Sequence, residues 1–393
     1  MRLGISALAI HTPGGIGRYA RILAAVLLTR FDGELHVFLQ RRRDMQAILS
    51  ELPRVEAERF VLRDNVQLHF SGFPAFPRYI LHQLELPGVF RPLNLDVYLN
   101  PDYVLPSLPG VSCHCTVHDT TPYEAPHLLG AKAQLIYRVS GRQSLSRAKT
   151  LICASEQTRA RMISLFPSLE PKLRTVVPCL APKLRQSGAD AYRRLDTIYV
   201  ETARGAVSIP LPFVLHVGVA GPRKNLPALL AAFNEVKLRM FHHRLVVIGG
   251  RAKPLPRQEA PVRQVALPDG SCLSLESQLP DVLHLGRVSD DDLVSLYRHA
   301  DLLVLPSLEE GFGYPVLEAL AFRTPALTAS NSPLAHLPGV ATIANVRDPV
   351  SIASALEDAL RRLPDLASEL SAGFSSDYYS CDRYLRDLLA AIL

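Results

Sequence analysis

The chain has no tryptophan, few cysteines for its length and no apolar run long enough to cross a bilayer. Without tryptophan there is no indole platform on which a base or a sugar could stack. Six cysteines in 393 residues do not make the dense disulfide framework of a small secreted domain, and the opening residues 1–8 are too short for a signal sequence. We therefore expect a cytoplasmic protein, either soluble or held peripherally at the inner face of the membrane.

Signatures of metal and nucleic-acid binding are missing as well. Cys113-His114-Cys115 has metal-binding residue types, but alternate strand residues face away from the residue between them, and no second pair follows at zinc spacing. Ser289 with Asp292 three residues later is typical of a helix cap, so the acidic run there is not assigned to a metal. Zinc-finger spacing, RNA-binding aromatic motifs and a basic heptad region are absent. We expect buried thiols, no metal or other cofactor, and no nucleic-acid partner.

Length and pattern predict two domains. A chain of 393 residues with 48% hydrophobic content exceeds what one core normally organises. Short apolar runs alternate with helical patterns in both halves, which favours doubly wound α/β domains with ligands at the carboxyl ends of parallel strands. We place a first domain at 1–185, a linker rich in Pro, Gly, Ser and charge at 186–210, a second domain at 211–375 and a final amphipathic helix at 376–393. Residues 251–281 form an irregular Pro- and Arg-rich segment to which we assign no role.

The most informative stretch is 306–320. A buried-strand pattern leads into a turn that contains Gly311 and Gly313, and a proline two residues later opens a helix with its φ already set for the first turn. The unpaired N–H groups of a helix start favour an anionic or hydroxyl-rich ligand. Glu310 and Glu318 flank the turn. The helix dipole would explain a lone glutamate here, but the pair across Gly-Phe-Gly favours a binding site.

This stretch resembles the donor-site signature of the retaining glycosyltransferases of family four: an acidic residue, Gly-Phe-Gly, a proline and a second glutamate. The resemblance implies the GT-B fold, in which two Rossmann-like domains face each other across a cleft, the first binding an acceptor and the second a nucleotide sugar. It implies that Glu318 holds the ribose hydroxyls and that Glu310 approaches the transferred sugar. The amides of Phe312 and Gly313 would donate to sugar hydroxyls, and Tyr314 belongs to the same donor site.

A second cluster follows the strand pattern at 213–219. Arg223 and Lys224 precede a helix for which Asn225 is a suitable N-cap, and cations at a helix N-terminus are disfavoured unless an anion binds there. A surface salt bridge is the plainer explanation, but it would contribute only about 0–1 kcal/mol. The matching Arg-Lys-Asn segment of the family implies that Arg223 and Lys224 bind the donor diphosphate and stabilise it as it leaves. We place Gly218 in the same donor site.

A glycine-rich loop near the start of the chain joins a strand pattern to a helix. Its glycines, Gly14, Gly15 and Gly17, lack the spacing of a dinucleotide-binding motif. Taken alone, they are as well explained by a tight chain connection as by a phosphate site. The resemblance implies the phosphate site, since the Gly-Gly-Ile-Gly-Arg segment of the family faces the cleft near the diphosphate and the acceptor. We therefore include Gly15 and Gly17 among the donor-binding residues.

His118 and Asp119 follow a short strand pattern at 115–117. Without further context, a histidine in this position is as often a structural residue or a cap as a catalyst. The pair resembles the His-Asp segment of the family, which is strongest in mannosyltransferase-like members; there the histidine contacts the donor sugar and the aspartate lies nearby. The resemblance implies catalytic roles for both residues and favours GDP-mannose as the donor.

The net charge of +6 and the pI near 9.0 come from arginines spread along the chain. The run at 41–43 and Arg138, Arg142 and Arg147 are explained as ordinary solvated helix faces. A membrane-facing acceptor surface is the alternative, because many members of the family act on lipid-linked sugars. Both interpretations stay open at this point.

These observations together predict a retaining, metal-independent hexosyltransferase that moves a sugar from a nucleotide-diphosphate sugar to a glycan or lipid-linked acceptor in polysaccharide or glycolipid biosynthesis. The chain departs from the family pattern at Phe322-Arg323, where a small residue and a glycine are usual, and at 337–340, which lacks an acidic residue. The departures leave two alternatives open. One is a nucleotide-sugar-binding scaffold subunit without turnover, and the other is a different GT-B enzyme such as an epimerase or a phosphorylase.

Overall fold

A computed structural model describes residues 1–12, 14–70, 88, 90–186, 196–203, 205–218, 221–237, 242–249, 263–266, 272–275 and 281–393. In the two short strands 263–266 and 272–275, only the backbone is described. The chain divides into two compact units. Unit 1 comprises Met1–Gln186 and Ser376–Leu393, and unit 2 comprises Ser187–Ser375.

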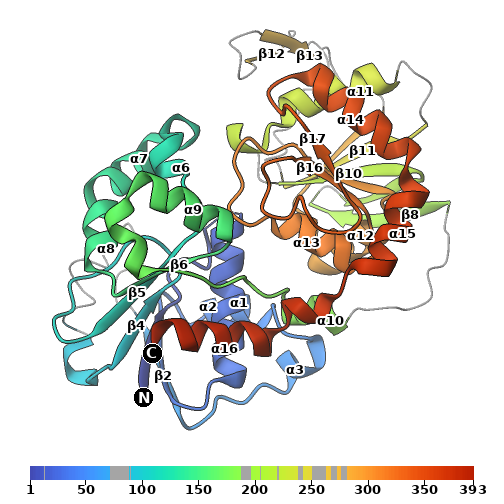
Figure 1. The fold of residues 1–393 in the computed structure, drawn as a ribbon. Helices are drawn as coiled ribbons and strands as arrows, with labels where there is room; N and C mark the ends of the chain where they lie inside the picture. Colours follow the sequence, from blue (N-terminus) through green and yellow to red (C-terminus); the bar gives the residue numbers. More distant parts are fainter. Residues whose placement is uncertain are drawn as a thin grey trace. The chain divides into compact units, whose positions relative to one another are not determined.

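Unit 1 is built on a seven-stranded parallel sheet with the order β3-β2-β1-β4-β5-β6-β7 (Figure 1). Its strands are β1 (Arg2–Ser6), β2 (Glu34–Leu39), β3 (Val66–Phe70), β4 (Val97–Asn100), β5 (Ser112–Val117), β6 (Thr150–Cys153) and β7 (Leu173–Thr175). The strand order reverses between β1 and β4. The loops that leave the carboxyl ends of these strands therefore diverge, which is the usual place for a ligand in such sheets.

Helices of unit 1 connect these strands. They are α1 (Gly15–Arg30), α2 (Asp44–Leu49), α3 (Arg54–Glu58), η2 (Arg91–Leu93), α6 (Thr121–Glu124), η3 (Pro126–Leu128), α7 (Ala131–Ile136), the π-helical η4 (Tyr137–Gly141), α8 (Arg142–Arg147), α9 (Glu156–Leu165), η5 (Pro167–Lys172), α10 (Pro182–Gln186), η7 (Ser376–Tyr379) and α16 (Cys381–Ile392). A π-helical turn therefore lies between α7 and α8.

The final helix, α16, lies on unit 1 beside α1 and β6 (Figure 1). The segment just before α16 is held by a backbone hydrogen bond in which Leu180 N donates to Tyr379 O at 3.0 Å. Thr150 Oγ1 donates to the Ala391 carbonyl at 3.2 Å near the other end. Tyr384 and Leu388 are buried in this contact, with 1% and 0% of their surface exposed. The amphipathic pattern of 376–393 thus has an apolar partner within unit 1.

Unit 2 contains a six-stranded parallel sheet with the order β14-β11-β10-β15-β16-β17. Its strands are β10 (Phe213–Val217), β11 (Arg244–Ile248), β14 (Val282–Gly286), β15 (Leu302–Leu305), β16 (Ala326–Ala329) and β17 (Val340–Ile343). The middle strands β15 and β16 are buried along their whole length. Parallel strands covered on both faces read as continuous apolar runs, which is why these segments were recognisable in the sequence.

Helices of unit 2 are η6 (Pro222–Lys224), α11 (Leu226–Lys237), α12 (Asp290–His299), α13 (Tyr314–Ala321), α14 (Pro349–Arg361) and α15 (Leu363–Gly373). The predicted cap of α12 is confirmed, because Ser289 Oγ accepts a hydrogen bond from Asp292 N at 3.0 Å. Asp348 likewise caps α14 by accepting from the amides of Val350 and Ser351. The metal-free explanation of the acidic run at 290–292 therefore has a structural basis.

Asn225 directly precedes α11, at the predicted N-cap position, and its carbonyl accepts a hydrogen bond from Leu229 N at 3.2 Å. Its backbone lies in the left-handed region, with φ 53°, at the end of η6. Its side-chain amide donates to the Val346 carbonyl at 2.6 Å. Asn225 therefore links the turn before α11 to the segment before α14. Left-handed geometry suits asparagine better than most residues, which is a second reason for the residue type at this position.

The segment expected to be a linker, 186–210, is not irregular throughout. Strands β8 (Thr197–Thr202) and β9 (Gly205–Pro210) form an antiparallel hairpin that belongs to unit 2. A second hairpin, β12 (Arg263–Ala266) with β13 (Cys272–Leu275), lies in the stretch that the sequence suggested to be irregular. Residues 187–195 and most of 251–281 lie outside the described residues.

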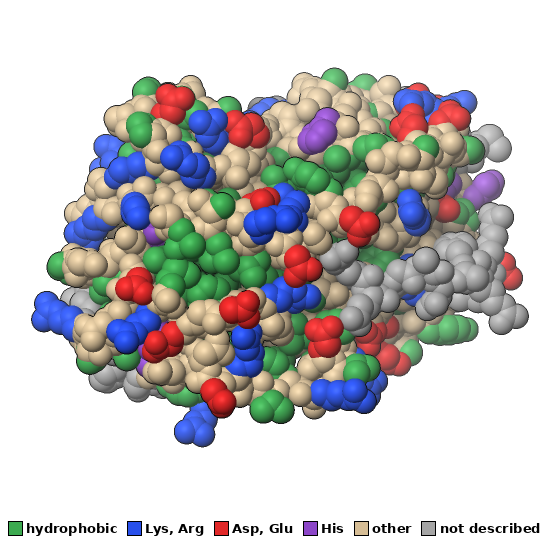
Figure 2. Space-filling view, turned by 60° about the horizontal axis from the view of Figure 1, so that its bottom comes forward, with side chains coloured by type: hydrophobic (Ala, Val, Ile, Leu, Met, Phe, Trp, Pro, Cys, Tyr) green, Lys and Arg blue, Asp and Glu red, His purple; other side chains and the backbone are tan. Residues whose placement is uncertain are grey.

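The cysteines are buried thiols, as expected, at Cys113, Cys115, Cys153, Cys179 and Cys381; the side chain of Cys272 lies outside the described part. Among the helices described, none is long and apolar enough to span a membrane. Figure 2 shows Lys and Arg side chains in small separate groups among Asp and Glu, in agreement with the dispersed charge of the sequence.

Candidate active site

Two loops meet at the carboxyl ends of neighbouring strands in unit 2. One follows β10 and contains Arg223 and Lys224, and the other follows β15 and contains Glu310. A backbone hydrogen bond joins them, since Leu308 N donates to the Arg223 carbonyl at 2.9 Å. Lys224 and Glu310, 86 positions apart in the sequence, are thereby brought to one edge of the sheet, as the topology of a doubly wound domain requires.

An ion pair lies at the centre of this edge. Lys224 Nζ is 2.7 Å from Glu310 Oε2, and the two side chains are only 14% and 13% exposed. Burial by itself raises the pKa of the Glu310 carboxyl, but the Lys224 and Arg223 cations outweigh it and hold the pKa below its ordinary value. Glu310 is therefore ionised at neutral pH, and its charge is opposed by cations from a different loop.

Gly218 makes room for this pair. A β-carbon on Gly218 would lie 3.1 Å from Lys224 Cγ and 3.3 Å from Lys224 Cδ. The lysine stem therefore passes directly over the backbone at residue 218. The predicted donor-site glycine has a packing role toward another predicted site residue, whatever it does for a ligand.

The glycine turn delivers the start of α13. Gly313 is the residue before the helix and has φ 98°, in the left-handed region that glycine adopts without strain. Gly311 is not in that region, so only one of the two glycines needs its conformational freedom here. The rings of Phe312 and Tyr314 pack edge to face at 5.1 Å, and both are nearly buried.

Glu318 projects from α13 into the interior of unit 2. The residue is 1% exposed, and its Oε2 accepts a hydrogen bond from the Tyr297 hydroxyl of α12 at 2.8 Å. Glu318, the residue predicted to bind the ribose, is thus hydrogen-bonded to another side chain of the protein. We did not assign Tyr297 a role in the site from the sequence; a tyrosine at an apolar helix position was the available signal, because a buried phenol needs a hydrogen-bond partner.

His216 is a further polar group that sequence reasoning missed. It lies within β10, is 1% exposed, and its Nδ1 donates to the Val304 carbonyl of β15 at 2.9 Å. Burial lowers the pKa of the His216 imidazole to about 4, with the Lys224 charge adding to the effect and the hydrogen bond to Val304 opposing it. A neutral imidazole therefore lies beneath Gly218 and Lys224. A histidine inside an otherwise apolar strand was the signal.

Glycines of the loop after β1 have different local environments. A β-carbon on Gly17 would lie 2.0 Å from the Thr12 carbonyl oxygen, so residue 17 must be glycine for the chain to pass. A β-carbon on Gly15, the first residue of α1, would meet nothing within 4 Å. Gly14 has φ 84° and provides the positive φ that the turn requires. Gly17 is thus explained by packing, whereas the space beside Gly15 is open within unit 1.

His118 and Asp119 lie at the carboxyl end of β5, half-buried. His118 Nε2 donates to the Pro101 carbonyl at 2.7 Å, and its ring meets Tyr19 of α1 edge to face at 5.0 Å. Asp119 Oδ1 accepts from Thr121 N at 3.0 Å, and the Tyr103 hydroxyl contacts both the amide and the carbonyl of Asp119. Both residues therefore have structural partners in addition to any role toward a ligand.

The structure gathers the predicted residues into two sets. Gly15, Gly17, His118 and Asp119 belong to unit 1, and the other predicted residues belong to unit 2. Tyr19 connects the first set, because it comes from the helix after the glycine loop and contacts His118. Within the described ranges, no group of three or more His, Cys, Asp or Glu side chains is arranged to hold a metal ion.

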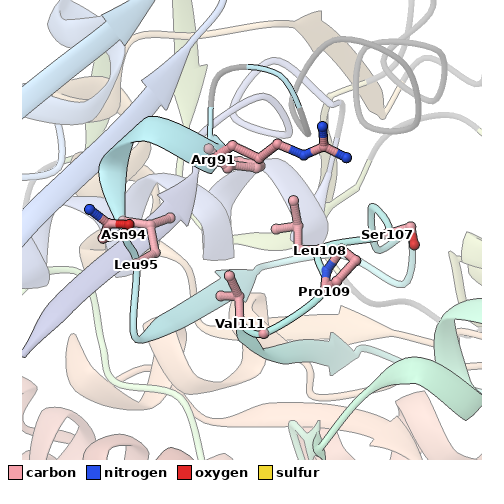
Figure 3. A pocket seen from close by; sticks show the side chains of 9 residues that line it. Arg91, Asn94, Leu95, Ser107, Leu108, Pro109 and Val111 are labelled. Atoms are coloured by element: carbon pink, nitrogen blue, oxygen red, sulfur yellow. The ribbon is translucent and has the colours of Figure 1, made fainter.

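A separate pocket of about 380 Å³ lies in unit 1 (Figure 3). It is lined by Phe90, Arg91, Asn94, Leu95, Ser107, Leu108, Pro109, Gly110 and Val111. Leu95 and Val111 precede β4 and β5, so the pocket is at the amino ends of these strands, whereas His118 follows the carboxyl end of β5. A strand of six residues spans about 20 Å. The pocket is therefore distinct from the predicted site.

The chain is similar to known glycosyltransferases. Residues 205–366, within unit 2, match the family described as glycosyl transferases group 1. The chain is 24% identical over 363 residues to the O-antigen chain mannosyltransferase B of Escherichia coli, covering 89% of this chain and 87% of that protein.

Two solved structures show the same fold. The glycosyltransferase WaaG, involved in lipopolysaccharide biosynthesis, superimposes with a TM-score of 0.63 at 14% identity, over 99% of this chain and 98% of WaaG. HepE of Anabaena, solved in complex with UDP-glucose, gives 0.60 at 13% identity, over 99% and 100% of the two chains. Residues 205–366 therefore match the glycosyl transferases group 1 family, the chain has the GT-B fold of two Rossmann-like domains, and it is similar over most of its length to a mannosyltransferase of O-antigen synthesis.

Proposed function

We propose that this glycosyltransferase is retaining and uses a nucleotide-diphosphate sugar, with GDP-mannose as the first candidate. The observation that carries the proposal is the buried Lys224–Glu310 ion pair, next to Arg223 at the carboxyl end of the unit 2 sheet. Cations at this edge of a parallel sheet suit the phosphates of a nucleotide.

Stabilisation of the charge on the leaving group is the main way in which the protein lowers the barrier of such a reaction. When the bond between the anomeric carbon and the diphosphate breaks, negative charge grows on the diphosphate oxygens. Arg223 and Lys224 stabilise that charge. The Lys224 side chain is oriented before the ligand arrives because Glu310 holds it, and Leu308 fixes the backbone at Arg223. Preorganised charges of this kind need little rearrangement at the moment of reaction.

The retaining outcome in this proposal comes from attack on the face of the sugar that the leaving phosphate departs from. Glu310 is ion-paired with Lys224, so we do not assign it as a nucleophile. The departing phosphate assists deprotonation of the acceptor hydroxyl, and the acceptor attacks from the face that the phosphate leaves. His118 contacts the donor sugar and Asp119 lies beside it, as the family resemblance implies.

The donor sugar and the acceptor are proposed from similarity. The O-antigen mannosyltransferase and the His118-Asp119 segment favour mannose, whereas HepE was solved with UDP-glucose. We propose a glycan or lipid-linked acceptor, a cytoplasmic location with peripheral contact at the inner face of the membrane, and a reaction that needs no metal.

A thermal-denaturation panel tests the donor first. GDP, UDP, ADP and dTDP and their common sugars are added without metal, and a ligand at 100 times its Kd should stabilise the protein by about 2.7 kcal/mol. We expect GDP and GDP-mannose to raise Tm most. A larger shift with another nucleotide would replace GDP in the proposal. No shift with any of them would contradict nucleotide-sugar binding, and a shift without consumption of the donor would favour the scaffold alternative.

Product analysis then separates the remaining alternatives. Incubation of GDP-mannose with membrane lipid extracts, in buffer with EDTA, should transfer sugar with its anomeric configuration retained. Inverted product would contradict the retaining mechanism, and activity restored only by Mg²⁺ or Mn²⁺ would contradict metal independence. An epimerised sugar or a sugar phosphate, without transfer, would identify a different GT-B enzyme.

A further inference from the structure

A buried tyrosine contacts the carboxylate that we propose for ribose binding. Tyr297 of α12 is 0% exposed, and its hydroxyl donates to Glu318 Oε2 of α13 at 2.8 Å. A hydrogen bond to an ionised acceptor is stronger than one between neutral groups. The last torsion of a glutamate side chain is broad, so the backbone of α13 alone does not fix the plane of the carboxylate. The Tyr297 hydroxyl supplies that orientation.

The ring of Tyr297 is held by Phe322. The two rings are stacked, with centroids 6.0 Å apart and planes inclined by 16°. Phe322 is 7% exposed, and the Arg298 guanidinium lies over its ring, 5.6 Å from the centroid. Phe322 immediately follows α13, the same helix that carries Glu318. One short helix therefore carries the carboxylate and, directly after it, the ring that supports its partner.

The backbone of Tyr297 is held as well. Thr324 Oγ1 donates to the Tyr297 carbonyl. Both ends of the tyrosine are therefore tied to the segment that runs from Glu318 to Thr324. Phe322, which departs from the family pattern in the sequence, is explained here as part of the support for Tyr297.

We propose that Tyr297 is a positioning residue for Glu318 and that Phe322 positions Tyr297, so that together they set the recognition of ribose hydroxyls. The inference rests on the proposed function, in which Glu318 accepts from those hydroxyls. It predicts that loss of the Tyr297 hydroxyl weakens recognition of the ribose specifically, whereas a purely structural tyrosine would affect all ligands of the site equally.

The test compares a ribonucleotide with its deoxygenated analogue. The Kd of GDP and of 2′,3′-dideoxy-GDP is measured by calorimetry for the wild type, Tyr297→Phe and Tyr384→Phe, with UDP and 2′,3′-dideoxy-UDP in parallel. Tyr384 is the matched control: it is equally buried, and its hydroxyl makes a 2.8 Å hydrogen bond to Tyr19 in unit 1.

We expect the wild type to prefer the ribonucleotide about tenfold or more, the scale of one hydrogen bond to a charged group. Tyr297→Phe should reduce that preference to about threefold or less, and Tyr384→Phe should leave it unchanged. A full preference retained in Tyr297→Phe would overturn the inference while leaving the ribose role of Glu318 intact. Equal affinity of the wild type for both members of each pair would overturn the ribose site itself.

A second variant keeps the test decisive if Tyr297→Phe does not fold. Phe322→Leu keeps an apolar side chain but removes the planar stack on Tyr297. The preference for the ribonucleotide should fall to a value between those of the wild type and Glu318→Gln. An unchanged preference in Phe322→Leu would contradict the part assigned to Phe322.

Discussion

Lys224 is the residue with the most direct consequence for activity. We expect Lys224→Ala to lower turnover about 100- to 1,000-fold, because one preorganised group that stabilises the leaving charge is removed. Single-turnover kinetics with the donor identified above measures this loss. The control is Lys172→Ala, whose amino group contacts the Ser146 carbonyl in unit 1. A loss of folding stability as large as the loss of activity would indicate a structural role for Lys224.

His216 should give unit 2 a pH-dependent stability. Its pKa is about 4 in the folded protein and 6.5 in the unfolded chain, so the unfolded state binds more protons between these values. The stability contribution is complete above pH 6.5 and is lost as pH falls toward 4, with a slope of at most about 1.4 kcal/mol per pH unit. Urea unfolding from pH 7 to 4.5 measures the slope.

The matched variant is His216→Asn, which keeps a donor for the Val304 carbonyl but does not titrate. Its stability should fall less steeply with acidification than that of the wild type. Parallel curves for the two proteins would show that His216 does not titrate in this range.

Arg323 is the other departure from the family pattern, and it carries backbone strain. Its φ is 66°, in the left-handed region, where a residue with a β-carbon is disfavoured by about 1–2 kcal/mol. We expect Arg323→Gly to stabilise unit 2 by about 0.5–1 kcal/mol, because the relief of this strain is partly offset by the greater entropy of glycine in the unfolded chain. Arg323→Ala separates the two effects, because it removes the side chain but keeps the strain. Stabilisation by alanine as large as that by glycine would contradict the backbone explanation.

At the scale of elements, two glycines at the start of α1 allow the effect of packing to be measured separately from that of ligand binding. Gly17→Ala should destabilise unit 1 by about 1–3 kcal/mol or more, because the new methyl group would meet the Thr12 carbonyl oxygen at 2.0 Å. Gly15→Ala should leave the stability nearly unchanged, because the space there is open. Thermal unfolding of the two variants makes the comparison.

The same pair of variants tests the donor-site role of Gly15. If a ligand approaches residue 15, Gly15→Ala should raise the KM for the donor while Tm stays constant. A wild-type KM in Gly15→Ala would remove Gly15 from the donor site. This result would leave the packing explanation of Gly17 untouched.

At the scale of the whole molecule, the last residues of the chain, 376–393, are part of unit 1, which also contains the first residues. Removal of residues 376–393 would uncover the faces of α1 and β6 on which α16 lies. It would also remove the buried side chains Tyr384, Leu388 and Ile392, each worth about 1.5–3 kcal/mol. We expect the truncated protein to lose the cooperative unfolding of unit 1 and to retain that of unit 2.

Hydrogen exchange followed by proteolysis resolves the two units in this experiment. The peptides of unit 2 should show unchanged protection, and those of α1 and β6 should lose theirs. Equal loss of protection in both units would mean that α16 supports the whole protein rather than unit 1.

Much of the fold was predictable from local pattern. Apolar runs such as 302–305 and 326–329 mark buried parallel strands, since both faces of such a strand are covered. Caps at Ser289 and Asp348 were predictable because side-chain oxygens at those positions satisfy helix amides a few residues away. The hairpin at 197–210 was not predicted, because the aromatic Tyr199 lies on the exposed face of β8 and hides its alternation, and β9 buries only Ile209.

The candidate site divides in the same way. The sequence by itself predicted two pairs, Arg223 with Lys224 and Glu310 with Glu318, because motifs of glycine, proline and charge at strand ends depend on residues only a few positions apart; the resemblance implied that both pairs serve one donor site. Only the tertiary structure decided that Lys224 pairs with Glu310, that His216 lies neutral beneath them, and that Tyr297 contacts Glu318. These contacts join residues from different strands and helices, and the spacing of one segment carries no information about which other segment the sheet will place beside it.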